Sequence, residues 1–360
     1  MKHAASAPAN PVRGRITWVD VTKGVAMFLV FFGHLGVQWF PALDRTLDAI
    51  YTFHMPLFFV TSGFFFHARY GFGQLAAKRA RMLLVPYYVF SVLALAKPVA
   101  QLVSPSLYKE GGNGLEGVVS SILTIVFAQG NSGLWFLWAV FTGQLALWAV
   151  VRLVRNRIPV LLVLMVAFVI ADFILQLMPW SQMLPFQLGK IFESVSYMGF
   201  GYVIGQTQNL RVWQEGDTKG RRAVLMVIAA ALFVAFYGVQ TTVEAEGVFL
   251  PLLWLIKFCT TITAIVTVVL LCTLVPQWGW LQTVGRDSLV FYGVNDFMLK
   301  IVKFAVFSIG GVEATHWPLI AQFAGGCTVV AAAMLLAAAV DWMVQRHARW
   351  MIGAFPHSRT

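Results

Sequence analysis

Apolar runs long enough to cross a membrane recur from one end of this 360-residue sequence to the other. A helix of about 20 apolar residues spans the hydrocarbon core, and it satisfies its backbone hydrogen bonds internally, as lipid requires. Charged residues make up 11% of the chain, against roughly a quarter in soluble domains. The short alternating segments of a membrane β-barrel are not found. The sequence therefore predicts an all-α, polytopic membrane protein.

We predict about ten spans in a single membrane domain that covers residues 1–360, with polar cytoplasmic tails at 1–15 and 343–360. The expected spans are 17–38, 50–67, 82–103, 134–151, 158–178, 186–206, 223–243, 249–275, 288–308 and 317–342. Most Lys and Arg residues lie in every second loop, which places those loops and both termini in the cytoplasm. These loops account for the net charge of +11, so the charge does not indicate a nucleic-acid partner.

The apolar run 116–128 decides the number of spans. It is shorter than a membrane-spanning helix, and a crossing there would move the basic loops that follow to the outer side. Turn signals rich in glycine flank it on both sides. We therefore expect a re-entrant or interfacial segment at this place.

The first span contains three ionisable residues, Asp20, Lys23 and His34. Such residues are costly inside a membrane and are functional candidates. Lys23 and His34 are eleven residues apart, so they share a helix face and lie about 16 Å apart along the axis. Asp20 precedes Lys23 by three residues and can pair with it. Taken singly, Lys23 could extend to the interface, and His34 could make an interhelical hydrogen bond.

The second span brings His54 into the membrane, with Ser62 further along the same span. Antiparallel packing against the first span would place His54 at a depth similar to that of His34. Two histidines at one depth suit proton transfer, because neutral imidazole accepts a proton near physiological pH. This arrangement favours a functional interpretation of His34 over a purely structural one.

A basic segment, Lys78-Arg79-Ala80-Arg81, precedes the third span on the predicted cytoplasmic side. It is either an anchor of the positive-inside type or a phosphate site, because arginine binds phosphate bidentately. A phosphate-bearing donor such as coenzyme A would suit the second interpretation.

Charged residues also occur in the outer halves of later spans. Glu193 follows Lys190 by three residues, which suits either an intramembrane ion pair or hydrogen bonding to a sugar. Four further lysines are Lys97, Lys257, Lys300 and Lys303. Snorkelling to the interface accounts for them. The sharper hypothesis is a basic outer vestibule for an anionic glycan or a lipid-linked saccharide.

An ordered set of motifs resembles acyltransferase family 3, especially its fucose 4-O-acetylase-like branch. The motifs are Asp20…Lys23-Gly24…Gly33-His34, Phe53-His54-Met55-Pro56-Leu57-Phe58-Phe59…Ser62-Gly63, Lys78-Arg79-Ala80-Arg81…Pro86-Tyr87, Leu134-Trp135-Phe136-Leu137 and Gly285-Arg286-Asp287-Ser288-Leu289…Tyr292. They occur in family order over most of the chain. The resemblance implies ten spans and transfer of an acyl group, usually acetyl, from cytoplasmic acyl-CoA to a saccharide hydroxyl at the outer side.

The resemblance also implies roles for single residues. His34 would be the catalytic histidine, and Lys23 stands where many members have arginine; lysine keeps the charge but lacks the planar fork. His34 would act as the base or as a transient acyl carrier. Asp20, which would orient Lys23 or help to organise the donor site, and His54 complete the candidate catalytic set. The candidate donor-binding residues are Lys23, Arg79 and Arg81. The candidate acceptor-binding residues are Ser62, Trp135, Glu193 and Asn295, the last in a region where many members carry a histidine.

Other function classes remain open at this point. A transporter or flippase for a glycan or small solute could use intramembrane His, Lys and Glu for proton coupling, although the chain shows no internal repeat. A non-catalytic membrane scaffold is the third class. For the enzyme, we expect acetyl-CoA or another acyl-CoA as donor, a saccharide or lipid-linked glycan as acceptor, membrane lipid, and a bacterial inner membrane. The three cysteines have no metal-type spacing, so no metal is expected.

Overall fold

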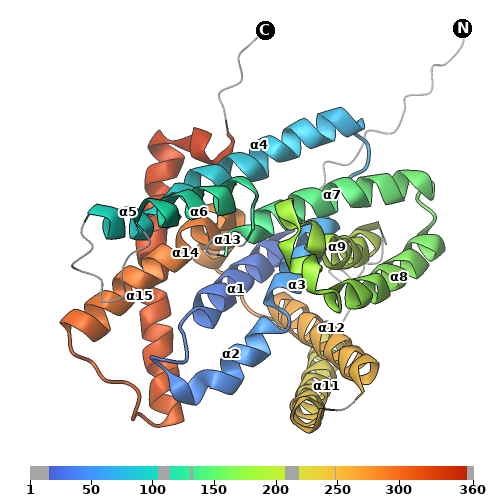
Figure 1. The fold of residues 1–360 in the computed structure, drawn as a ribbon. Helices are drawn as coiled ribbons and strands as arrows, with labels where there is room; N and C mark the ends of the chain where they lie inside the picture. Colours follow the sequence, from blue (N-terminus) through green and yellow to red (C-terminus); the bar gives the residue numbers. More distant parts are fainter. Residues whose placement is uncertain (1–15, 104–113, 130–132, 207–218, 248, 355–360) are drawn as a thin grey trace, which may run out of the picture.

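The computed structural model describes residues 16–354 apart from 104–113, 130–132, 207–218 and 248, and the described part is helical (Figure 1). Within these described residues, six helical stretches are long and apolar enough to cross a membrane. They are α4 (Phe72–Ser91) continued by η2 (Val92–Leu95) and α5 (Ala96–Val103), α7 (Trp135–Leu153), α8 (Ile158–Gln176), α11 (Lys219–Glu246), α12 (Leu250–Leu274) and α15 (Leu319–His347). The chain is therefore an integral membrane protein with several spans, as the apolar runs predicted.

The other four predicted spans coincide with shorter helices, α1 (Thr17–Gly33), α3 (His54–Phe64), α9 (Ile191–Gln206) and α14 (Ser288–Lys303). These helices have 17, 11, 16 and 16 residues. In α3, every residue from His54 to Phe59 is buried, and in α9 every residue from Ser194 to Gly199. A helix that is buried on all faces belongs to the interior of the bundle. Spans 17–38 and 50–67 were predicted too long because apolar loop residues such as Leu35, after α1, and Phe66, after α3, also pack into the core.

Several short helices complete the fold and form its connections. They are η1 (Pro41–Leu43), α2 (Asp44–Tyr51), α6 (Gly114–Val126), η4 (Pro179–Met183), η5 (Pro185–Lys190), α13 (Gly279–Arg286), the π-helical η6 (Phe304–Ile309) and η7 (Arg349–Ile352). The run predicted at 116–128 is the short helix α6, and Tyr87 of α4 donates a hydrogen bond of 2.9 Å to its Ile125 carbonyl. Its re-entrant or interfacial position stays a prediction.

Two clefts lie at opposite ends of α9, and the termini of several other helices line each of them. One cleft, of about 620 Å³, is lined by residues that follow α3 and α7, among them Arg69 and Arg155. The other, of about 490 Å³, is lined by residues from α2, the end of α8 and the start of α12. The residues after α3 and after α7 share one cleft, so these two helix ends lie on the same side of the bundle. The helix ends therefore alternate between two sides, as the distribution of Lys and Arg predicted.

Helix α4 begins at Phe72, ten residues before the predicted start of the third span. The basic segment is therefore helical and continues directly into the span. Successive residues of an α-helix are about 100° apart, so Arg79 and Arg81 point to different sides of α4. Lys78 and Arg81, three residues apart, share a face.

The core helices approach one another through glycines. A side chain at Gly63 of α3 would meet the backbone of Met198 in α9, and a side chain at Gly201 of α9 would meet the Val60 carbonyl oxygen of α3. Small residues at such positions let helix backbones touch in membranes. The inner helices are therefore held in a close, specific register.

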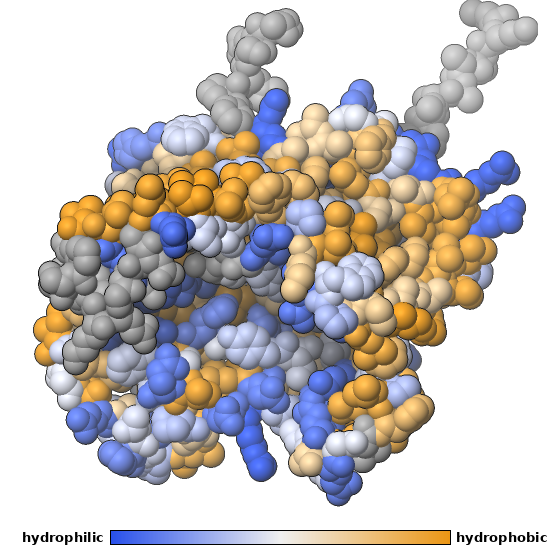
Figure 2. Space-filling view, in the orientation of Figure 1, coloured by the Kyte–Doolittle hydropathy of each residue, from blue (hydrophilic) through white to orange (hydrophobic). Residues whose placement is uncertain are grey.

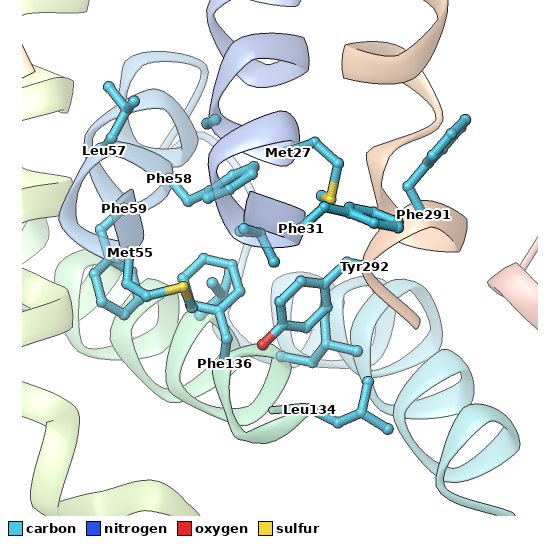
Figure 3. Close-up of a cluster of buried hydrophobic side chains, with 14 of the residues drawn as sticks. Met27, Phe31, Met55, Leu57, Phe58, Phe59, Leu134, Phe136, Phe291 and Tyr292 are labelled. Carbon is cyan, nitrogen blue, oxygen red and sulfur yellow. The ribbon is translucent and has the colours of Figure 1, made fainter. Parts of the chain in front are cut away.

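An aromatic layer joins α1, α3, α7 and α14 in the core (Figure 3). The Phe136 ring lies 4.8 Å from that of Phe59 and 5.6 Å from that of Tyr292, centroid to centroid. Tyr292 in turn donates a hydrogen bond to the Gly133 carbonyl just before α7. This layer positions the ends of α1, α3 and α7, where the candidate site lies.

Candidate functional site

His34 is placed at the C-terminal end of α1 by a lysine from α14. The Lys303 ammonium donates to the carbonyl oxygens of His34 and Leu35, at 3.1 and 3.3 Å. A cation at a helix C-terminus is favourable because it satisfies the last carbonyls and the helix dipole. The sequence suggested that Lys303 snorkels or lines a basic vestibule, whereas the structure uses it to hold this helix end.

Three side chains form a histidine–tyrosine cluster at this helix end: His34, Tyr51 and His54. The Tyr51 hydroxyl lies 3.4 Å from Nδ1 of His34, and its ring centroid lies 5.2 Å from that of His54. Nδ1 of His54 contacts the Ile50 carbonyl at 2.9 Å, so this nitrogen carries the proton. The predicted proximity of the two histidines is found, with Tyr51 between them. Sequence reasoning missed Tyr51, since one tyrosine near a span end is typical of interfacial belts.

The second nitrogen of His34 faces the segment that precedes α7. A methyl group added at Gly133 would lie 4.0 Å from Nε2 of His34, so backbone closes this side of the ring without touching it. Asn295 is buried on α14, donates to the Tyr292 carbonyl at 2.5 Å, and has an Oδ1 without a hydrogen-bond partner among the described residues. Among the described residues, Nδ1 of His34 has a hydrogen-bonding neighbour and Nε2 has none, so Nε2 is the nitrogen open to chemistry there.

Figure 2 shows the molecule hollowed at the centre of the view, between α6 and α2 of Figure 1, with hydrophilic residues around the hollow. The C-terminal end of α1 lies in this part of the view.

Trp135, the first residue of α7, is half-buried, and the Lys190 ammonium lies 5.8 Å from the centroid of its ring. Lys190 forms an ion pair of 3.0 Å with Glu193. Trp135 and Glu193 are therefore linked through one lysine.

Ser62 does not belong to this cluster. It lies eight residues after His54 on α3, which is about 12 Å along the helix axis. This distance places it toward the other end of α3, away from the histidine–tyrosine cluster, and its role in acceptor positioning or oxyanion support stays a prediction.

The other end of α1 carries a cluster of charged residues. Lys23 lies within electrostatic reach of Asp20 and Arg79, and its ammonium lies 5.4 Å from the centroid of the Phe65 ring. Helix α13 packs against this end so closely that a side chain at Gly285 would meet the Asp20 carbonyl. A hydrogen bond and the charge of Asp287, with smaller effects of Asp341 and Asp20, raise the pKa of Arg286 at the end of α13. The structure therefore brings Asp20, Lys23 and Arg79 together.

Arg81 lies elsewhere, in a basic cleft of about 1010 Å³ between α4 and the end of the chain. The lining residues include Lys78, Arg81, Arg346, Arg349 and Trp350. The α4 backbone touches the segment after η7, because a side chain at Gly353 would meet the Arg81 carbonyl. The sequence indicated Arg346 and Arg349 only as cytoplasmic charges. Their convergence with Arg81 depends on the packing of η7, which follows α15, against α4.

Comparison with known proteins assigns the family. The family model described as an acyltransferase domain, of acyltransferase family 3, matches residues 16–339. Neither the curated proteins nor the solved structures provided a match. The match covers both ends of α1, the basic part of α4 and the aromatic layer. The chain therefore belongs to acyltransferase family 3 and is a membrane O-acyltransferase.

Proposed function

We propose that this enzyme moves an acetyl group from cytoplasmic acetyl-CoA to a hydroxyl of a saccharide or lipid-linked glycan on the outer side of a bacterial inner membrane, in a bundle of ten crossings. The observation that carries the proposal is that the two ends of α1 hold two different groups of polar side chains. Its start carries Lys23 beside Arg79, and its end carries His34 beside Tyr51 and His54. The order of the motifs favours the fucose 4-O-acetylase-like branch.

Cationic groups on the cytoplasmic side suit a donor that carries several phosphates. Arginine forks and lysine ammoniums bind phosphate oxygens through charge-assisted hydrogen bonds. The basic cleft at Arg81, Arg346 and Arg349 would hold the nucleotide phosphates. Lys23 and Arg79 would hold the part of the donor that enters the bundle, with Asp20 orienting Lys23. The pantetheine arm would then carry the thioester along α1 toward His34.

His34 suits the role of general base. If Nδ1–H donates to the Tyr51 oxygen, then Nε2 accepts the proton of the acceptor hydroxyl. The acceptor oxygen attacks the thioester carbonyl carbon, and the carbon–sulfur bond breaks. The leaving thiolate takes the proton from Nε2–H, so the products are an O-acetyl ester and coenzyme A. His54 would hold the Tyr51 ring in place.

Substitution of His34 tests this assignment. We expect His34→Ala to abolish acetyl transfer from radiolabelled acetyl-CoA, because a general base contributes roughly 10²–10⁴-fold to the rate. His316→Ala is the matched control, since His316 is exposed in the segment before α15. Full activity in a folded His34→Ala variant would contradict the assignment of His34 as the general base.

A transporter and a scaffold predict different results. A transporter would neither bind nor cleave acetyl-CoA, and a scaffold would keep its phenotype after His34 is replaced. Measuring the O-acetyl content of surface polysaccharide with and without the protein then identifies the acceptor. If the content is the same in both, the saccharide part of the proposal is wrong.

A further inference from the structure

An outer cleft of about 490 Å³ lies between α2, α8, α9, α11 and α12, and it has no assigned role. Its floor continues into a recess of about 90 Å³ lined by Asp172, Glu193, Tyr197 and Phe258. Trp254 forms one wall, with its ring centroid 5.1 Å from that of Phe173 and 6.1 Å from that of Phe258. Aromatic walls with a few polar groups are typical of small-molecule sites.

The cleft reaches the candidate catalytic residues from two directions. Tyr51 lines the cleft, and its hydroxyl lies 3.4 Å from Nδ1 of His34. Lys190 also lines the cleft, and its ammonium lies 5.8 Å from the centroid of the Trp135 ring. A molecule held in the cleft would therefore contact Tyr51, whose hydroxyl neighbours His34.

The charges that line the cleft are negative on balance. Both of its lysines are paired: Lys190 with Glu193 at 3.0 Å, and Lys257 with Glu244 at 2.6 Å. Two further carboxyl groups, those of Asp48 and Asp172, also line it. The basic vestibule suggested by the sequence is therefore wrong for Lys257, while the side chain of Lys97 lies outside the described residues. Lys300, outside the cleft lining, is bound to Asp296 at 2.6 Å.

Hydrogen-bonding capacity remains inside the cleft. Asp48 accepts a hydrogen bond of 3.0 Å from Tyr237. Asp172 accepts from Gln176 at 3.4 Å through Oδ2, and its buried Oδ1 has no hydrogen-bond partner among the described residues. Carboxylate oxygens accept hydrogen bonds from neutral hydroxyl groups, whereas they repel a second anion.

We propose that this outer cleft is the acceptor site and that it selects saccharides without acidic groups. This inference rests on the proposed acetyl transfer by His34. The sugar hydroxyls would donate to Asp172 and Glu193, and the ring would pack against Trp254. A uronic acid or a phosphorylated sugar would face the surplus of carboxylates and would be disfavoured.

The test compares a neutral and an acidic acceptor that otherwise match. The full-length protein in nanodiscs receives radiolabelled acetyl-CoA with octyl β-glucoside or octyl β-glucuronide, both below micelle-forming concentrations. We expect the wild type to favour the glucoside at least tenfold. The Asp172→Asn/Glu193→Gln double variant should reduce this preference on the order of tenfold, because each removed charge acts at about 10 Å in a medium of intermediate dielectric.

Two single variants serve as matched checks. Glu246→Gln removes a carboxylate at the same end of α11 but outside the cleft lining, so the preference should not change. Lys257→Gln leaves Glu244 without its counter-charge, so the preference for the glucoside should increase. This change of opposite sign keeps the test decisive if the double variant does not fold.

The outcomes separate this inference from the proposed function. A preference for the glucuronide, or a preference that the cleft variants leave unchanged, would overturn the inference. Cleavage of acetyl-CoA that depends on His34, with transfer to neither sugar, would also overturn it and would leave the donor part of the proposed function intact. Absence of any cleavage that depends on His34 would instead refute the proposed function.

Discussion

At the scale of single residues, the imidazole of His34 is positioned by contacts at two places. Lys303 binds the backbone carbonyls of His34 and Leu35, and the Tyr51 hydroxyl faces Nδ1 of the ring. A base of this kind needs a defined tautomer, which the partner of the second nitrogen sets. The hydroxyl of Tyr51 is therefore a positioning group for His34.

Replacing Tyr51 with phenylalanine isolates that hydroxyl. We expect Tyr51→Phe to lower kcat on the order of tenfold to a hundredfold, a part of what the base itself contributes, with little change in KM for acetyl-CoA. Tyr88→Phe is the control, because Tyr88 is exposed and its hydroxyl contacts Val126 of α6. Steady-state kinetics decides the matter, and an unchanged kcat would remove Tyr51 from the mechanism.

At the scale of elements, the short inner helices are positioned by backbone contact at glycines. Gly201 of α9 faces the Val60 carbonyl of α3, whereas a side chain added at Gly238 of α11 would have no atom within 4 Å. Side-chain volume is therefore excluded between α3 and α9 but tolerated on α11.

This contrast predicts opposite effects of the same substitution. Gly201→Ala should destabilise the protein by about 1–3 kcal/mol, because the two helices must separate, and should lower the Tm by several degrees. Gly238→Ala should raise the Tm slightly, since alanine favours a helix over glycine by about 1 kcal/mol. Thermal unfolding in detergent measures both, and equal effects of the two substitutions would contradict the packing.

The contact between α4 and the chain end supports a second prediction at this scale. We expect Arg346→Gln/Arg349→Gln to weaken binding of acetyl-CoA about tenfold or more at low salt, and less at high salt, because exposed charges are screened. Arg152→Gln/Arg155→Gln is the control, since these arginines line a different cleft, together with Arg69. Equilibrium binding of radiolabelled acetyl-CoA is the measurement. Equal affinities of the two double variants would exclude the basic cleft at Arg81 as the donor site.

At the scale of the whole molecule, the helix ends alternate between two sides. Arg69 and Arg155 line one cleft, and Glu244 lines the other. The start of α1 and the end of α15 also lie on one side, because the charges of Asp20 and Asp341 both raise the pKa of Arg286. In the proposed reaction, the donor and the acceptor would approach His34 from these opposite faces.

Cysteine labelling checks this topology directly. A membrane-impermeant maleimide added to intact cells should label Glu246→Cys, whereas Arg69→Cys and Arg155→Cys should react only after lysis. The unsubstituted protein supplies the background from its three cysteines. Reaction of Arg69→Cys and Arg155→Cys from different sides would mean that α6 crosses the membrane.

The sequence by itself determined the membrane class, the alternation of sides and the family. These properties depend on the length of apolar runs, on the placement of Lys and Arg, and on short ordered motifs, all of which are local. The same local patterns singled out His34, Lys23 and Arg79. They also overestimated the lengths of the first two spans, because apolar composition does not distinguish a helix from a loop packed in the core.

Only the tertiary structure decided which groups meet. The Tyr51 hydroxyl faces His34, and Lys303 donates a hydrogen bond to the His34 carbonyl at the end of α1. Arg346 and Arg81 line the same cleft, although they are far apart in sequence. The structure also paired Lys257 with Glu244 and so made the outer cleft acidic on balance. The physical reason is that such contacts depend on how helices pack and rotate against one another, and residues from every packed element contribute to that arrangement.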